Sequence, residues 1–69
     1  MSAVADDLSP DGLSRLRHDL RTPLTVVIGF AEILASTRAI SDEDRRDYAE
    51  RVLSAGIEIR EMIDAAKLD

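Results

Sequence analysis

Two series of apolar residues at helical spacing, joined by a short connection at Thr37–Ser41, most strongly constrain how this 69-residue chain can fold. In the first half, apolar side chains recur in steps of three and four at Leu13, Leu16, Leu20, Leu24, Val27, Ala31 and Leu34. In the second half they recur in the same way at Tyr48, Val52, Ala55, Ile59, Met62 and Ala66. Each series predicts an amphipathic helix. Because the connection is so short, we expect the helices to be antiparallel neighbours.

Capping residues predict where the two helices begin. Ser9-Pro10-Asp11 offers an N-cap hydroxyl, a proline suited to the first helical position and an acid for the positive helix end. Ser41 precedes three acids at 42–44 and predicts the second start in the same way. We therefore expect one domain over residues 1–69, with a tail at 1–8, helices at 9–37 and 42–67, and a turn at 38–41.

A chain this short rarely buries enough apolar surface to be stable alone. It has no cysteine for a disulfide, and with one Phe, one Tyr and no Trp its core must be aliphatic. Leu53, Ile57 and Ile63 also make the second apolar series wider than a contact between two helices requires. We therefore expect an all-α fold, an antiparallel helical hairpin that pairs as a homodimer into a four-helix bundle.

Charge and hydropathy exclude several classes of partner. The net charge of −5 argues against a nucleic-acid partner, because a phosphate backbone is bound through basic patches. The acidic N-terminal stretch is unlike a signal peptide, and no apolar run is long enough to span a membrane. We expect a cytoplasmic segment that makes no membrane contact. With no cysteine and one histidine, we expect no metal site.

Pro23 lies inside the first predicted helix, where it removes a backbone donor and crowds the carbonyl of Asp19 at a cost of about 3 kcal/mol. One interpretation is that the helix ends there. The apolar series continues on both sides, at Leu20 and Leu24, and favours a continuous helix with a bend near Asp19–Pro23. We assign Pro23, Leu20 and Leu24 structural roles.

His18, the only histidine, lies on the opposite face of the helix from the apolar series. On a helical wheel of about 100° per residue it falls about 160° from Leu20. Its neighbours one turn away include Arg15, Arg21 and Thr22. A neutral exposed imidazole has a nucleophilic nitrogen, and nearby arginines favour a phosphoryl group. From position alone, a solvated surface histidine without chemistry is an equally good interpretation.

The string around His18 resembles the phospho-acceptor box of sensor histidine kinases, and it reads His18-Asp19-Leu20-Arg21-Thr22-Pro23-Leu24. The later string Gly29-Phe30-Ala31-Glu32-Ile33-Leu34 resembles the pattern that usually follows this box. The resemblance covers essentially the whole chain, because the dimerisation and phosphotransfer domain of this family is itself a helical hairpin that pairs into a four-helix bundle.

The resemblance implies that His18 is phosphorylated from ATP and passes the phosphoryl group to an aspartate on the receiver domain of a response regulator. ATP and magnesium would be bound by a separate catalytic domain in the same or another chain. The sequence contains nothing that resembles an ATP site, so we expect no cofactor bound by this domain and no activity from it alone. We expect it to be a domain excised from a longer protein.

The resemblance also implies roles for three neighbours of His18. Asp19 matches the acid that orients or deprotonates the imidazole, although adjacent side chains on a helix diverge by about 100°. Thr22 matches the position that places a water molecule for dephosphorylation of the response regulator. In the alternative interpretation, the Thr22 hydroxyl only bonds to a backbone carbonyl near the bend. Arg21 matches a basic position that supports the phosphoryl charge.

A second apolar stripe at Val26, Phe30 and Ile33 has two interpretations. It packs against the second helix or the second protomer, which we favour for Phe30. Alternatively Val26, Gly29 and Ile33, on the His18 side, form the ledge on which a response regulator docks in relatives. Gly29 fits the second use because helical glycine costs about 1 kcal/mol relative to alanine, so a close approach would explain it. At Gly56 we expect close packing between helices.

Two other functions compete with phosphotransfer by a dimer. In one, the hairpin is a structural dimerisation bundle without phosphotransfer. In the other, it is a monomeric phosphotransfer bundle, which would require four helices in one chain, where the sequence predicts two.

Overall fold

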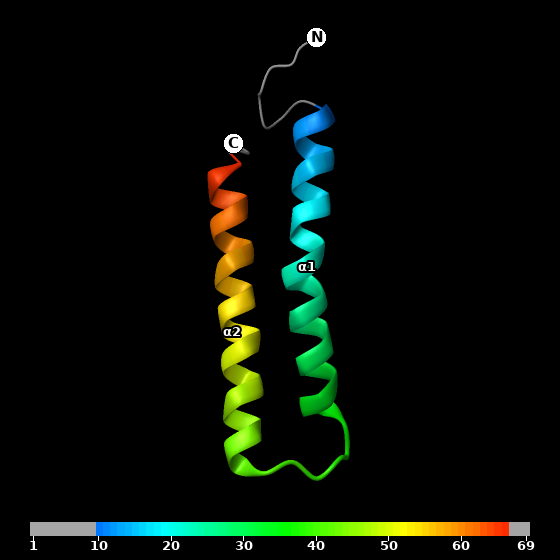
Figure 1. Cartoon of the computed structure of the whole chain (residues 1–69), viewed down its shortest axis with the longest axis vertical. Coiled ribbons are helices and arrows are strands. Elements are labelled where there is room, and N and C mark those ends of the chain that lie inside the picture. The colour runs from blue at the N-terminus through cyan, green and yellow to red at the C-terminus, as the bar shows by residue number, and fades with distance from the viewer. Residues whose placement is uncertain (1–9, 67–69) are drawn as a thin grey trace.

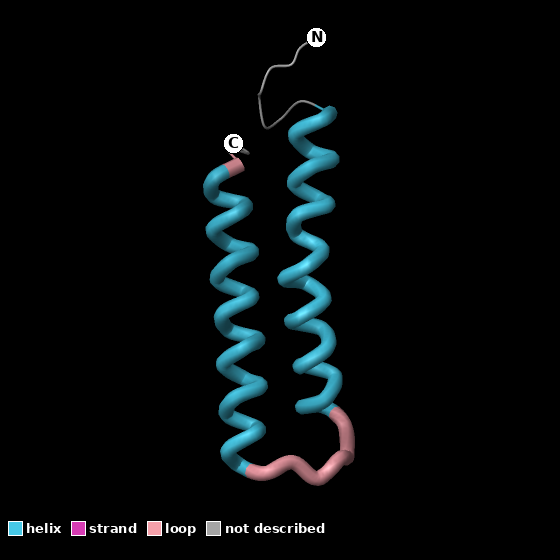
Figure 2. Tube along the Cα trace, viewed as in Figure 1, coloured by secondary structure: helices cyan, strands magenta, loops and turns pink. Residues whose placement is uncertain are grey.

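The chain forms two α-helices joined by a short connection in the computed structural model, which describes residues 10–66 (Figure 1). Helix α1 spans Pro10–Ala35 and helix α2 spans Asp42–Ala65. The helices run side by side in opposite directions, and the described residues contain no strand (Figure 2). The predicted all-α helical hairpin is therefore confirmed.

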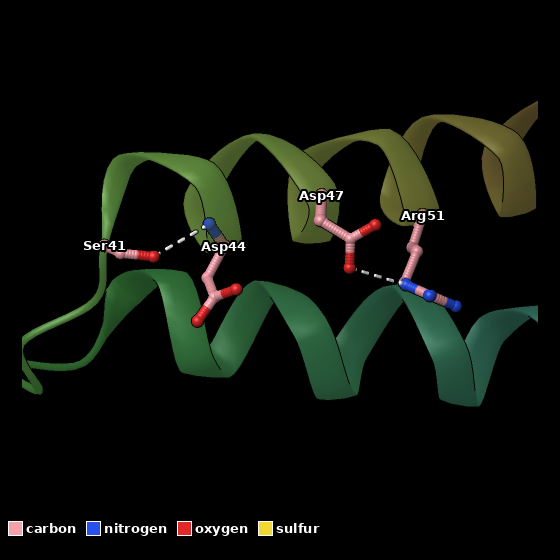
Figure 3. A network of polar contacts seen from close by, with 4 residues as sticks. All are labelled: Ser41, Asp44, Asp47 and Arg51. Carbon is pink, nitrogen blue, oxygen red and sulfur yellow. Dashed lines mark hydrogen bonds and ion pairs between the residues drawn. The ribbon is translucent and has the colours of Figure 1, made fainter.

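The start of α2 follows the predicted capping chemistry (Figure 3). Ser41 has extended backbone angles, and its hydroxyl accepts a hydrogen bond of 3.0 Å from the backbone N–H of Asp44. The backbone carbonyl of Ser41 accepts the first helical hydrogen bond from Arg45 at 2.9 Å. Three acids occupy the first turn, where their negative charges interact favourably with the positive end of the helix dipole. The corresponding cap predicted at Ser9 lies outside the described residues.

Helix α1 ends two residues before the predicted boundary at 37, because Ser36 closes its last turn. The Ser36 hydroxyl donates to the carbonyl of Ile33 at 2.7 Å, and the Ser36 backbone N–H reaches the same carbonyl at 3.2 Å. The Ser36 hydroxyl also accepts from the backbone N–H of Arg38 at 3.2 Å. These local bonds compete with continuation of the helix. Helix α2 ends at Ala65, and its predicted boundary at 67 lies outside the described residues.

The contact between the helices is built mainly from aliphatic side chains. On α2, Ala55 and Ala66 are buried, and the other members of the predicted apolar series are half-buried, at Tyr48, Val52, Ile59 and Met62. On α1, Pro23 is buried and half-buried side chains come from Leu16, Leu20, Val27 and Leu34. The Phe30 and Tyr48 rings pack with their centres 5.2 Å apart. This confirms the prediction that Phe30 packs against the second helix.

Helix α1 continues through Pro23 without interruption, which confirms that this proline does not end the helix. The hydroxyl of Thr25 donates to the carbonyl of Arg21 at 2.9 Å, within the turn that the proline disturbs. A hydroxyl in this position adds a second donor to a carbonyl near the point where Pro23 supplies no N–H. The bend near Asp19–Pro23 stays a prediction.

A large part of the apolar surface stays exposed in the hairpin. In the described part of the chain, six large apolar side chains are between 36% and 62% exposed, namely Leu13, Leu24, Ile28, Leu53, Ile57 and Ile63. Among the described residues no large side chain is fully buried. Neither described helix has the length and apolarity to cross a lipid bilayer. The contact between the two helices thus buries only part of the apolar surface of the hairpin.

Candidate functional site

His18 lies in the N-terminal half of α1 and is exposed. Its imidazole makes no hydrogen bond or ion pair with another side chain within residues 10–66. The half-buried residues of α1 lie on the face toward α2, so the imidazole points away from the helix contact, as the helical wheel predicts. The ring nitrogens are therefore accessible to a phosphoryl donor.

Asp19 is exposed as well, and no hydrogen bond joins its carboxylate to His18 in the described part of the chain. The physical reason is that adjacent side chains on a helix point about 100° apart. A role for Asp19 in orienting the imidazole requires a change of rotamer or a bridging group, and it stays a prediction.

Thr22 is exposed one turn after His18 and lines a groove between the helices. Among the described residues, the Thr22 hydroxyl makes no hydrogen bond to a backbone carbonyl, so the alternative interpretation does not hold for Thr22 in the hairpin; Thr25 makes a bond of this kind instead. Sequence reasoning missed Thr25, although a threonine four residues after Arg21 is the usual spacing for such a bond. The Thr22 hydroxyl is left free to bind a water molecule or a partner.

Arg21 and Pro23 lie on different sides of α1. The Arg21 side chain is exposed and forms no ion pair with the described acids, whereas Pro23 is buried against α2. Leu20 is half-buried and Leu24 is 43% exposed. Arg21 is thus available to an anion, and Pro23 belongs to the packed face.

A groove of about 410 Å³ runs between the helices beside Thr22. Thr22, Pro23 and Val26 line it from α1. Its α2 wall is formed by Ala55 of the predicted apolar series and by five polar residues that sequence reasoning did not assign to a site, Asp47, Glu50, Arg51, Ser54 and Glu58. The signal was present, since the five polar residues follow one edge of the α2 apolar series at helical spacing.

Arg51 is the positively charged residue that lines this groove, and it already forms an ion pair and contacts an aromatic ring. Its Nε donates to the Asp47 carboxylate at 3.0 Å (Figure 3), and its guanidinium carbon lies 5.7 Å from the centre of the Phe30 ring. The carboxylates of Glu50 and Glu58 form no ion pair with the described cations. The groove therefore presents an acidic rim over a floor that includes Val26 and Ala55.

The residues predicted to form a docking ledge differ in exposure. Val26 and Ile33 are half-buried and Gly29 is exposed. A Cβ atom at Gly29 would meet nothing within 4 Å, so the hairpin itself does not require glycine there. The same holds for Gly56, and the prediction that it packs closely against the other helix is wrong within the hairpin. Gly56 is exposed and so lies outside the contact with α1.

Within residues 10–66, no three His, Asp or Glu side chains are grouped so that they could hold a metal ion. The exposed side chains at this part of α1 are one imidazole with carboxylate, hydroxyl and guanidinium neighbours, from His18, Asp19, Thr22 and Arg21.

Comparisons with known proteins agree with this arrangement. The family model described as the His Kinase A (phospho-acceptor) domain matches residues 13–67. The chain is 30% identical over 63 residues to the cell-division control histidine kinase PdhS of Brucella anthropi, in an alignment covering 83% of this chain and 6% of the relative. It is 36% identical over 61 residues to the sensor histidine kinase YcbM of Bacillus subtilis, covering 83% of this chain and 20% of the relative.

A PdhS protein of Brucella ovis is 28% identical over 71 residues, covering 94% of this chain and 7% of the relative. No solved structure matches the chain significantly. The chain thus spans a fifth or less of these curated relatives. The family match includes His18 and extends over most of both helices. The chain belongs to the His Kinase A phospho-acceptor domain family of sensor histidine kinases.

Proposed function

We propose that His18 accepts a phosphoryl group in a two-component pathway and passes it to an aspartate of a response regulator. The observation that carries this proposal is an exposed imidazole, free of bonds to other described side chains, inside the residues that match the phospho-acceptor family. A nucleophile in this role must be reachable by two different partners in turn, and an exposed helix face permits that.

The reaction is a nucleophilic substitution at phosphorus. A ring nitrogen of His18 attacks the γ-phosphorus of ATP, the new P–N bond forms as the bond to the bridging oxygen breaks, and ADP leaves. The imidazole proton goes to the Asp19 carboxylate or to solvent. We propose that a separate catalytic domain, in the same or another chain, holds ATP and magnesium, so this domain binds no cofactor and is inactive alone. Its use of ATP also favours a cytoplasmic location.

Two further residues support the transfer in this proposal. Arg21, exposed and unpaired among the described residues, neutralises part of the phosphoryl charge from the turn after His18. Thr22 positions a water for removal of the phosphoryl group from the response regulator, a role supported by its exposed hydroxyl, which lines the groove and makes no bond among the described residues.

We also propose that the chain acts as a homodimer, in a four-helix bundle. The support is the exposed apolar surface of the hairpin, where Ile28 is 53% and Leu53 is 62% exposed. On a wheel of about 100° per residue, Leu13, Leu24 and Ile28 lie about 20–80° to one side of Leu20. Covering this surface with a second copy would bury apolar groups that water otherwise contacts.

The receiver domain of the response regulator is proposed to dock on the other edge of the hairpin. On the same wheel Thr22 and Val26 lie about 120–160° from Leu20, on the side opposite Leu24. The groove there has an apolar floor beside the turn that carries His18. Val26 and Ile33 supply apolar contact and Gly29 permits close approach. Dimer formation and receiver docking therefore use different surfaces.

Phosphorylation with γ-labelled ATP and a cognate catalytic domain tests the proposed function. We expect an acid-labile label on the wild-type chain and none on His18→Gln, with transfer of the label to a receiver domain. The matched control is Arg60→Gln, an exposed substitution on α2 outside the groove, which should label like the wild type. If the wild-type chain takes up no label, the proposal that His18 accepts a phosphoryl group is refuted, and the structural dimerisation bundle is favoured instead.

A further inference from the structure

Four side chains surround His18 on the surface of α1. Residues three and four positions apart on a helix are neighbours, with about 5–6 Å between their Cβ atoms. For His18 these neighbours are Ser14 and Arg15 on the preceding turn, and Arg21 and Thr22 on the following turn. Helix α1 is continuous over this whole interval, and all four side chains are exposed. The imidazole therefore lies between two hydroxyls and two guanidinium groups.

Arg15 is free to bind an anion. Asp11 and Asp19 lie four residues before and after it, yet neither forms an ion pair with it. The pairing of Asp47 with Arg51 at 3.0 Å shows that a carboxylate and an arginine at this spacing can meet on a helix of this hairpin. A guanidinium stays charged and presents a planar set of donors that fits phosphoryl oxygens.

The two arginines flank His18 on opposite sides. On a wheel of about 100° per residue, Arg15 lies about 60° to one side of His18 and Arg21 about 60° to the other. One approaches from the turn before and the other from the turn after. A phosphoryl group on either ring nitrogen would thus have a cation within one helical turn in both directions along the axis.

We propose that Arg15 is a phosphoryl-binding residue, which holds the oxygens of the incoming and the bound phosphoryl group on His18 opposite Arg21. This inference rests on the proposed function of His18. It assigns a role to a side chain outside the His18–Leu24 string, and it makes the phosphoryl site span two turns of α1. Arg17 provides the contrast, because it lies about 100° from His18, toward the apolar edge of the helix.

Phosphoramidate is a suitable probe, because it donates a phosphoryl group without a catalytic domain. A ring nitrogen of His18 attacks its phosphorus, the new P–N bond forms as the P–N bond of phosphoramidate breaks, and ammonia leaves. The ring proton goes to solvent. A positive charge at Arg15 would stabilise both the anionic donor and the phosphorylated imidazole. The rate at which phosphohistidine forms therefore reports whether Arg15 contacts the phosphoryl group.

The experiment compares the wild-type chain with Arg15→Gln, Arg15→Lys, Arg17→Gln and His18→Gln, with helicity checked by circular dichroism. We expect Arg15→Gln to slow labelling about threefold, the scale of one exposed ion pair. Arg15→Lys should restore most of the rate and Arg17→Gln should match the wild type. Raising the salt concentration should shrink the difference, because screening weakens exposed charge pairs.

The outcomes separate the two proposals. A wild-type chain that labels on His18, with Arg15→Gln and Arg17→Gln equal in rate, would overturn the role of Arg15 and leave the function of His18 intact. A salt-independent loss in Arg15→Gln that lysine does not rescue would also overturn it. A wild-type chain that takes no phosphoryl group from phosphoramidate or from ATP with a catalytic domain would overturn the proposed function itself.

Discussion

Leu53→Ala tests the proposed dimer most directly, because Leu53 is the most exposed large apolar side chain among residues 10–66. It keeps 62% of its surface exposed in the hairpin. Full burial of a leucine side chain contributes about 1.5–3 kcal/mol, so covering the exposed part would contribute about 1–2 kcal/mol in each protomer. A two-fold dimer contains this contact twice, which gives about 2–4 kcal/mol, or about 30- to 700-fold in the dissociation constant.

Alanine keeps one methyl group, so we expect the lower end of this range, a dimer about 30-fold weaker than the wild type. Sedimentation velocity over a series of concentrations measures the dissociation constant. The matched control is Leu53→Met, which conserves most of the volume and should dimerise within about threefold of the wild type. Circular dichroism would show whether the hairpin still folds.

Two results would refute this reasoning. A Leu53→Ala chain that dimerises as tightly as the wild type would mean that the partner does not cover this surface. A wild-type chain that sediments as a folded monomer at micromolar concentration would mean that the hairpin tolerates its exposed apolar surface, and the homodimer would be wrong.

The remaining predictions concern a cap and a glycine. Ser41→Ala removes the hydroxyl that accepts from Asp44 at 3.0 Å, so we expect a loss of about 1 kcal/mol and a melting temperature lower by about 4–8 °C. An unchanged melting curve for Ser41→Ala would contradict this prediction. The control is Ser54→Ala, a substitution in the middle of α2. Gly29→Ala should raise the melting temperature by about the same 4–8 °C, because alanine favours a helix by about 1 kcal/mol over glycine and its Cβ would meet no atom within 4 Å. In a transfer assay the same substitution should slow delivery to the receiver domain. Unimpaired transfer would remove Gly29 from the docking surface.

The start of α2 was predictable because its signal is local. Ser41 and the acids after it act on the turn that they themselves form, so no distant contact is needed to interpret them. The α2 apolar series was predictable for a related reason. Its spacing places Ala55 and Ala66 on one face, and both are buried.

The end of α1 and the role of Gly56 were less accessible to sequence reasoning. Ser36 could continue the helix or close it, and the choice depends on its bonds to Ile33 and Arg38. Gly56 costs helix stability in either case, and sequence alone does not say which neighbour, if any, approaches it. Such positions depend on competition between nearly equal local and tertiary interactions.

The candidate site also contains one feature that local sequence signals predict and one that depends on how the helices pack. The position of His18 on the free face of α1 followed from helical spacing alone. The groove did not, because it requires Thr22 and Val26 of one helix to lie opposite Glu50 and Ser54 of the other. That register is set by the packing of the two helices, which no single stretch of the sequence encodes.

The polar contacts of the hairpin have a mechanical consequence. Among residues 10–66, side-chain hydrogen bonds lie within one helix, within the connecting segment, or between a helix and that segment. The aromatic contact of Phe30 with Tyr48, and the Arg51 guanidinium over Phe30, hold the helices together in the half nearer the connection. Toward His18 the helices touch mainly through aliphatic side chains, so a small rotation or axial shift of α1 there would mainly slide apolar groups past one another. The half of the hairpin that carries the imidazole is therefore held by less directional contacts than the half beside the connection, where Phe30 contacts Tyr48 and Arg51.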